Sequence, residues 1–149
     1  MAHNNLGILL ADEGHLDEAI LQYREALRIG PQFAFAQNNM GNALMQKGQL
    51  DKAISHFNEA LRLDPNYAEA QNNMGIAMAK QGDLEKAIGF FMASLKANPD
   101  NVGRQGNLLR AIDKLEDKEK AAAYYRSALD IAEAANEQEL AEIIREEAR

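Results

Sequence analysis

The sequence predicts an all-α solenoid, in which short helix-turn-helix units of similar sequence stack along one axis. Three observations support this fold class. A 34-residue pattern recurs along the chain, and each copy holds two stretches with apolar residues at helical spacing. The 10 glycines and 3 prolines are too few for the many turns of a β-rich protein. At 34 residues per unit, the 149 residues hold four units and a short remainder.

The repeat is clearest in the motif Asn-Asn-Leu/Met-Gly, which occurs at residues 4–7, 38–41 and 72–75. The same step relates other positions: Gly14, Gly48 and Gly82; Ala19, Ala53, Ala87 and Ala121; Tyr23, Phe57, Phe91 and Tyr125; Pro31, Pro65 and Pro99. A fourth copy is degenerate, because Leu109 and Glu116 replace the two glycines and Glu133 replaces the proline. These steps predict units at residues 1–33, 34–67, 68–101 and 102–135, followed by residues 136–149.

The second unit illustrates what each recurring position does. Gly48 lies between the two periodic stretches, where a residue free to adopt positive φ can end one helix and reverse the chain. Gly41 and Ala53 are small, so the paired helices can approach closely while Phe57 fills the space beyond them. Pro65 ends the second helix, because proline there would lose a hydrogen bond and clash. We therefore expect helix, turn and helix in every unit.

The last residues, 136–149, are predicted to form a capping helix that covers the apolar end of the array. Asn136 followed by Glu139 fits a capping box, in which Asn136 would be the N-cap of the new helix. The helix would carry one apolar stripe, formed by Leu140, Ile143 and Ile144. The remaining residues are mostly charged, as expected for a surface that faces water.

The first helix of the first unit carries large apolar residues that no preceding unit covers. These residues are Leu6, Leu9 and Leu10. We expect this face to be covered either by repeats that precede it in a larger protein or by another copy of the chain. Because the chain starts within a unit, the first alternative is favoured. The second would make the chain a homo-oligomer.

The net charge excludes several classes of partner. The 16 Lys and Arg residues against 23 Asp and Glu residues give a charge of −7, the wrong sign for binding nucleic acid or an anionic membrane. No apolar run approaches the roughly 18 residues of a membrane-spanning helix, and the N-terminus lacks a signal pattern. We expect a cytoplasmic protein without a nucleic-acid partner or direct membrane contact.

The sequence predicts no catalytic residue, metal or cofactor. Cysteine is absent, which removes thiol nucleophiles and thiolate metal sites. His3, His15 and His56 occupy different repeat positions and lack the paired spacing of metal ligands. The glycines are isolated, so they form no phosphate-binding loop. We expect no enzymatic activity from these residues.

A row of asparagines is the feature that packing does not explain. One column recurs in every unit and a second precedes it in the first three units: Asn5, Asn39, Asn73 and Asn107; Asn4, Asn38 and Asn72. Because an amide both donates and accepts, such a row can bind the backbone of an extended peptide. The same amides could instead bond between adjacent helices, and both alternatives stay open.

Further positions on the first helices are predicted to line the same groove. Shallow pockets are expected from Phe35, Met45 and Ile76, and Asn42 lies in the line beside the asparagine row. Basic residues enter the line only toward the fourth unit, at Lys80, Arg110 and Lys114. The predicted groove is thus apolar and amide-rich at its centre.

The recurring series of residues is Leu/Met-Gly, then Gly, Ala, Tyr or Phe, Ala and Pro. At these spacings the series resembles the tetratricopeptide repeat (TPR) family over essentially the whole chain. The resemblance implies a right-handed superhelix of helix pairs, whose first helices line a concave groove. The asparagine row is similar to the ladder inside the TPR superhelix of O-linked N-acetylglucosamine transferases, where peptide lies in the groove.

Chaperone-binding members of the family use a clamp for two carboxylates, and this chain departs from it. The corresponding places hold Asn4, Ile8, Asn39, Glu69 and Asn73. Only Asn39 fits, and Glu69 would repel a carboxylate. A receptor for chaperone C-terminal tails is therefore disfavoured.

The first functional hypothesis is a non-enzymatic scaffold that binds an extended peptide or partner segment in the Asn-lined groove. One alternative is a substrate-recruiting arm of a larger enzyme such as a glycosyltransferase, with the catalytic domain outside these residues. Another is a self-assembly scaffold that uses the exposed N-terminal face.

Overall fold

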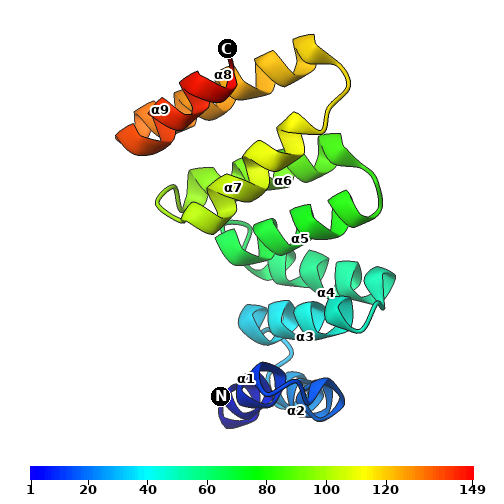
Figure 1. Ribbon diagram of the computed structural model, residues 1–149. Helices are drawn as coiled ribbons and strands as arrows, with labels where there is room; N and C mark the ends of the chain where they lie inside the picture. Colours follow the sequence, from blue (N-terminus) through cyan, green and yellow to red (C-terminus); the bar gives the residue numbers. More distant parts are fainter.

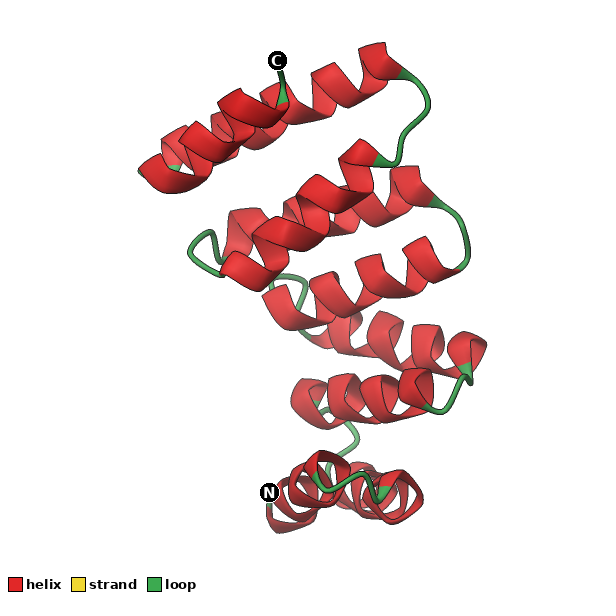
Figure 2. Ribbon diagram, in the orientation of Figure 1, coloured by secondary structure: helices red, strands yellow, loops and turns green.

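The computed structural model describes residues 1–149 as nine α-helices joined by short loops, without a β-strand (Figure 1, Figure 2). The helices are α1 (Ala2–Asp12), α2 (Leu16–Ile29), α3 (Ala34–Gln46), α4 (Leu50–Leu63), α5 (Ala68–Lys80), α6 (Leu84–Ala97), α7 (Val102–Asp113), α8 (Lys118–Ala134) and α9 (Gln138–Glu147). Helices α1 to α6 form three pairs that stack along one axis, so the two termini lie at opposite ends of the molecule. None of the helices combines the length and apolar character needed to cross a membrane.

The turn inside each of these three pairs contains a glycine in the left-handed region. The φ angles are 84° at Gly14, 76° at Gly48 and 86° at Gly82. In the second pair, the Gly48 N–H donates to the Met45 carbonyl at 3.0 Å, and the Gln49 N–H donates to the Leu44 carbonyl at 2.9 Å. These bonds satisfy carbonyls at the end of α3 while the chain reverses.

Each of the three pairs also holds an aromatic ring directly against a glycine of its first helix. A Cβ added at Gly41 would lie 2.6 Å from a ring carbon of Phe57 and 3.1 Å from the carbonyl oxygen of Ala53. Phe57 and Ala53 are fully buried. The same contact joins Gly7 to Tyr23 and Gly75 to Phe91. Because only glycine leaves room for the ring, this contact sets the distance between the paired helices.

The pairing changes in the fourth unit. Helix α7 packs mainly against α6, and α8 packs more extensively against α9 than against α7. Leu109 stands where the earlier units have glycine, so this position no longer leaves room for the close ring contact seen at Gly41. Glu116 stands in the place of the turn glycines, and the backbone there has no positive φ.

The predicted capping box at Asn136 is wrong. Asn136 has a φ of 61°, and its N–H donates to the Glu133 carbonyl at 3.0 Å. The Glu137 N–H donates to the Ala132 carbonyl at 2.8 Å, which repeats the bonding of the glycine turns. The N-cap of α9 is Glu137, and no side chain caps this end. Asparagine tolerates the left-handed region better than most residues, so Asn136 ends α8 instead of starting α9.

Helix α9 nevertheless closes the array as expected. Leu140 and Ile144 are buried, whereas Ile143, the third member of the predicted stripe, is 39% exposed. Ala141 is buried in addition. Leu140, Ala141 and Ile144 join the continuous apolar core that runs from α2 to α9.

We expect Gly41→Ala to destabilise the fold by about 1–3 kcal/mol, because the new methyl group overlaps a buried ring that has no room to move. The matched control is Gly89→Ala on α6, where an added Cβ meets no atom within 4 Å. This change should stabilise the fold by roughly 0.5–1 kcal/mol, because alanine favours the helix. Urea unfolding followed by far-UV circular dichroism measures both. Equal midpoints for the two variants would contradict the close-packing account.

Candidate functional site

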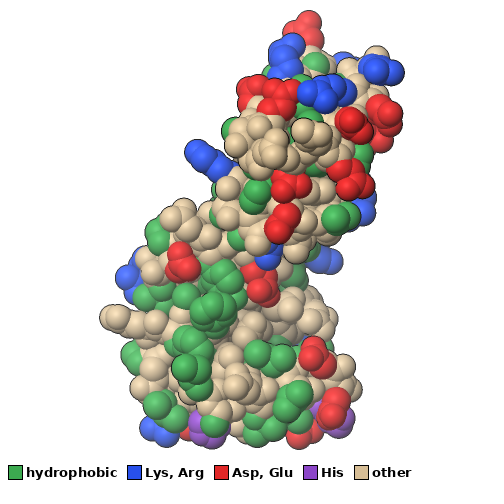
Figure 3. All heavy atoms as spheres, turned by 90° about the vertical axis from the view of Figure 1, so that its left-hand side faces the viewer, with side chains coloured by type: hydrophobic (Ala, Val, Ile, Leu, Met, Phe, Trp, Pro, Cys, Tyr) green, Lys and Arg blue, Asp and Glu red, His purple; other side chains and the backbone are tan.

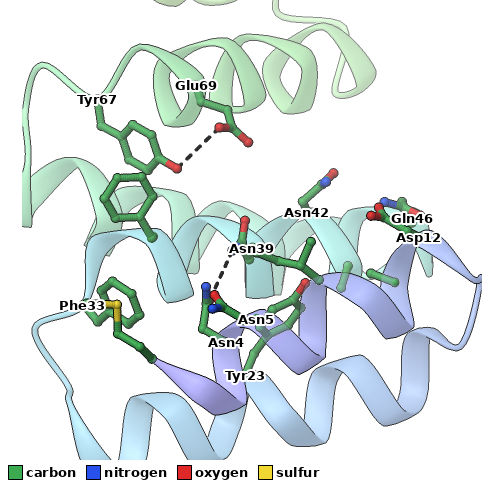
Figure 4. Close-up of a pocket in the computed structure, with 15 residues that line it drawn as sticks. Asn4, Asn5, Asp12, Tyr23, Phe33, Asn39, Asn42, Gln46, Tyr67 and Glu69 are labelled. Atoms are coloured by element: carbon green, nitrogen blue, oxygen red, sulfur yellow. Dashed lines mark hydrogen bonds between the residues drawn. The ribbon is translucent and has the colours of Figure 1, made fainter.

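Two cavities lie on the face formed by the first helices of the units. The larger has a volume of about 620 Å³ and lies between α1, α3 and the start of α5 (Figure 4). Its lining includes aromatic rings, amides and two carboxylates: Tyr23, Phe33, Phe35 and Tyr67; Asn4, Asn5, Asn39, Asn42 and Gln46; Asp12 and Glu69. The smaller, of about 300 Å³, lies between α5 and α7. Figure 3 shows apolar side chains gathered at the level of α1 to α5 and charged ones around α8 and α9.

An aromatic cluster forms one end of the larger cavity. The ring centroids of Phe33 and Phe35 are 6.0 Å apart, and those of Phe35 and Tyr67 are 4.9 Å apart, with the rings tilted in both pairs. Such offset geometry is favourable between aromatic rings. Phe35 is 56% exposed, so an apolar surface remains open to a ligand.

The prediction from sequence included Phe35 but missed Phe33 and Tyr67. These two residues stand 34 positions apart, each immediately before a first helix, where the next unit has Asn101. Asn101 accepts a hydrogen bond from the Arg104 N–H as an N-cap, whereas the two aromatic residues make no side-chain cap. The sequence did hold a signal for these two residues, which is their 34-residue spacing. An aromatic residue at the N-cap position does not cap the helix with its side chain, so its recurrence there indicates another role.

Glu69 links the aromatic cluster to the asparagines. The Tyr67 hydroxyl donates to Glu69 Oε2 at 3.4 Å, and Asn38 Nδ2 donates to Glu69 Oε1 at 3.1 Å. Burial and the Glu69 carboxylate raise the pKa of Tyr67, and burial and Asp12 raise the pKa of Tyr23 to about 12. Both phenols therefore stay neutral near pH 7, and Asp12 and Glu69 are the only side chains lining the cavity that carry a formal charge.

The asparagines bond to one another across consecutive first helices. Asn39 Nδ2 donates to Asn4 Oδ1 at 3.1 Å, Asn73 Nδ2 to Asn38 Oδ1 at 3.0 Å, and Asn107 Nδ2 to Asn72 Oδ1 at 2.9 Å. Asn38 is completely buried and Asn73 is 8% exposed. One of the two alternatives, a bond between adjacent helices, is thus realised in all three pairs.

The half-buried amides keep further hydrogen-bonding capacity. Asn39 uses only Nδ2 within the molecule, so its carbonyl oxygen and its second N–H are free where it lines the larger cavity. Asn107 accepts from Arg110 at 2.7 Å and lines the smaller cavity. Bonding between helices therefore does not use up the amides that face the groove.

The structure divides the predicted groove residues into three groups. The larger cavity is lined by Asn4, Asn5, Phe35, Asn39 and Asn42. The smaller is lined by Ile76 and Asn107. Neither is lined by Asn38, Met45, Asn72 and Asn73. In the predicted self-association face, Leu6 and Leu9 are 46% and 62% exposed, whereas Leu10 packs against the core.

The histidines lie apart, and two of them bond to amides whereas His15 bonds to the Glu18 carboxylate at 3.2 Å. His3 Nδ1 and Gln22 Oε1 are 2.8 Å apart, and His56 Nδ1 and Gln37 Oε1 are 2.7 Å apart. Burial lowers the pKa of His56. No group of three or more His, Asp and Glu side chains comes together in the structure.

We expect Asn38→Ala to destabilise the fold by about 1–3 kcal/mol, because it removes a buried acceptor and leaves Asn73 Nδ2 without a partner. Asn39→Ala also removes the partner of Asn4 Oδ1, but both residues line the open cavity, where water can replace the lost bond, so the change should cost about 0.5–1 kcal/mol. Thermal unfolding of both variants beside the parent measures the difference. Equal losses would mean that the bond from Asn39 to Asn4 stabilises the fold as much as the bond from Asn73 to Asn38.

Comparison with solved structures gives the same fold at low identity. The first TPR of Spaghetti (RPAP3) bound to the HSP90 peptide SRMEEVD matches with 23% identity and a TM-score of 0.74, over 78% of this chain and 92% of that one. MamA matches with 21% identity and a TM-score of 0.74, over 91% and 79%. The Sgt2 TPR domain from Aspergillus fumigatus matches with 22% identity and a TM-score of 0.74, over 80% of both chains. The all-α superhelical solenoid is confirmed.

Family models cover most of the chain. A model described as TPR repeat matches residues 7–48 and 41–82, and two models of the tetratricopeptide repeat match residues 68–101 and 105–134. Among curated proteins, none matches this chain. Since the first model alone covers more than half of the residues, the chain belongs to the tetratricopeptide repeat family.

Proposed function

We propose that this chain is a protein-interaction module that holds an extended peptide segment along the face of its first helices. The observation that carries the proposal is the larger cavity, where the exposed ring of Phe35 lies beside the free carbonyl and N–H of Asn39. Apolar surface next to unsatisfied amide groups is the combination that an extended peptide requires, because its side chains and its backbone both need partners.

The two kinds of group would have different roles. Asn39 and Asn42 offer donors and acceptors to the peptide backbone, which every sequence shares. The rings of Phe35 and Tyr67 would contact one side chain of the peptide and contribute most of the buried apolar area. A peptide held in this way by an open cavity is expected to bind with a Kd on the order of micromolar.

The similar structures support the proposal in one respect, since the first TPR of Spaghetti is bound to an HSP90 peptide. This architecture can therefore hold a peptide. The peptide of the present chain should differ, because Glu69 stands where the chaperone clamp would need a cation. The Glu69 carboxylate is fixed in place by Asn38 and Tyr67, and it would repel an acidic tail.

The same groove would serve in the substrate-recruiting arm of a larger enzyme such as a glycosyltransferase. The asparagine ladder favours this alternative, because its row of amides resembles the one inside the superhelix of O-linked N-acetylglucosamine transferases. These residues would then supply recognition, and a catalytic domain elsewhere in the protein would supply the chemistry. A sugar-nucleotide-binding domain encoded next to the repeats would support this assignment.

A second candidate function, self-assembly, rests on the exposed N-terminal face. Leu6 and Leu9 are 46% and 62% exposed, and they lie three residues apart on α1. Large apolar side chains that are exposed together favour association. The predicted homo-oligomer would cover them with a second copy of the same face.

Replacement of Phe35 by Ala should weaken peptide binding about tenfold or more with little change in stability, because the exposed ring contributes contact area to the ligand. An amide-shift titration of the 15N-labelled protein with a library of unstructured peptides measures this effect. Ile143→Ala on α9, which also removes an exposed apolar side chain, is the control and should bind like the parent. A Phe35→Ala variant with parental affinity would contradict the assignment of the cavity.

Leu9→Glu should dissociate an oligomer formed through the N-terminal face, because it places a charge in an apolar contact. Light scattering over a range of concentrations, beside the control Val102→Glu at a 78% exposed position of α7, measures the mass. A parent protein that stays monomeric at high concentration would eliminate self-assembly.

A further inference from the structure

The charged residues of the groove are segregated by sign. The larger cavity is lined by Asp12 and Glu69 and by no lysine or arginine. The smaller cavity is lined by Lys80, Arg110 and Lys114 and by no carboxylate. The groove therefore has an acidic half, formed by α1, α3 and the start of α5, and a basic half between α5 and α7.

The repeat makes this change of sign systematic. One repeat position, at the end of each first helix, holds Asp12, Gln46, Lys80 and Lys114 in the four units. A position four residues earlier holds Ile8, Asn42, Ile76 and Arg110. Equivalent places on a regular scaffold thus change from acidic through neutral to basic along the groove.

The charged side chains of the two cavities form no ion pair within the molecule. Ion pairs occur at seven places in the structure, and none of them includes a charged residue of either cavity. Glu69 is held by two neutral groups, the Tyr67 hydroxyl and the Asn38 amide. Arg110 is oriented by Asn107 at 2.7 Å. Glu69 and Arg110 are therefore held in place by neutral groups and remain free of a direct ion pair that would neutralise them before a ligand binds.

We infer that the peptide held in this groove carries a lysine or arginine for the larger cavity and one or more carboxylates for the smaller one. This inference rests on the proposed function and specifies its ligand. A cation in the larger cavity meets the Glu69 carboxylate and the faces of Phe35 and Tyr67, and aromatic faces attract cations. A carboxylate in the smaller cavity meets the cationic heads of Lys80, Arg110 and Lys114.

The geometry also sets the separation of the two charges. The cavities are one to two helix spacings apart, from α3 to the gap between α5 and α7, and packed helices lie about 8–10 Å from one another. The separation is therefore roughly 8–20 Å, which an extended chain spans with about two to six residues at about 3.3 Å per residue. A basic residue and an acidic residue adjacent in sequence would not reach both cavities.

The test uses synthetic peptides about ten residues long, with blocked ends and a background of Ser, Ala and Gln. The bipolar peptide carries one Arg and, about five positions away, two adjacent Glu residues, so that its opposite charges can reach the two cavities. In a neutral peptide, Gln replaces all three, and in an acidic peptide Glu replaces the Arg. Fluorescence anisotropy at low and high salt measures Kd for each peptide.

The bipolar peptide should bind roughly tenfold more tightly than the neutral one at low salt, and the advantage should shrink in about 1 M salt, where the screening length is about 3 Å. Glu69→Gln should weaken the bipolar peptide about threefold and leave the neutral peptide unchanged. The double variant Lys80→Gln, Lys114→Gln should also weaken binding of the bipolar peptide and leave binding of the neutral peptide unchanged. Lys96→Gln on α6, a lysine outside both cavities, is the matched control and should bind both peptides like the parent.

Neutral and bipolar peptides that bind equally well would overturn the charge assignment while leaving the groove as a peptide site. The same holds if the Glu69 and lysine variants bind the bipolar peptide like the control. An acidic peptide that binds more tightly than the bipolar one would assign carboxylates to both cavities and would also overturn the inference. Failure of every peptide to bind would overturn the inference together with the proposed function.

Discussion

The close contact between a glycine of the first helix and an aromatic ring of the second fixes the geometry on which the groove depends. In the second pair the ring of Phe57 leaves no room for a Cβ at Gly41, and each of the two neighbouring pairs repeats this contact. Similar pairs stack in the same way, and consecutive first helices lie close enough for Asn39 to reach Asn4 and for Asn73 to reach Asn38. Amide bonds of about 3 Å tolerate little variation in the spacing of these helices.

The fourth unit shows what remains when this contact is lost. With Leu109 in place of glycine, α8 moves its main contact to α9, while α7 keeps its contact with α6. The ladder therefore still reaches α7, where Asn107 bonds to Asn72. Helices α8 and α9 then close the core with buried apolar residues. The change of pairing therefore coincides with the loss of the glycine that lets the aromatic ring approach.

The repeat made most of the fold predictable, because positions such as Gly41 and Phe57 specify their own packing partners. Two features escaped prediction for physical reasons. Asn136 fits both an N-cap and a left-handed turn, and only tertiary packing selects between them. Phe33 and Tyr67 lie just before the helices, where helical periodicity gives no signal. The bonding of the asparagines also stayed open in sequence, because an amide such as Asn39 can serve a helix, a ligand or both.

A regular scaffold can still recognise one sequence, because uniform and variable positions have separate roles. The paired amides are held by neighbouring helices before any ligand arrives, so a peptide backbone would meet them with little loss of conformational entropy. Such a row does not discriminate among peptides. Discrimination must come from equivalent positions that differ between units, such as Phe35, Glu69 and Gly103, which offer a ring, a carboxylate and no side chain in successive units. Specificity then depends on the register that places each peptide side chain opposite one unit.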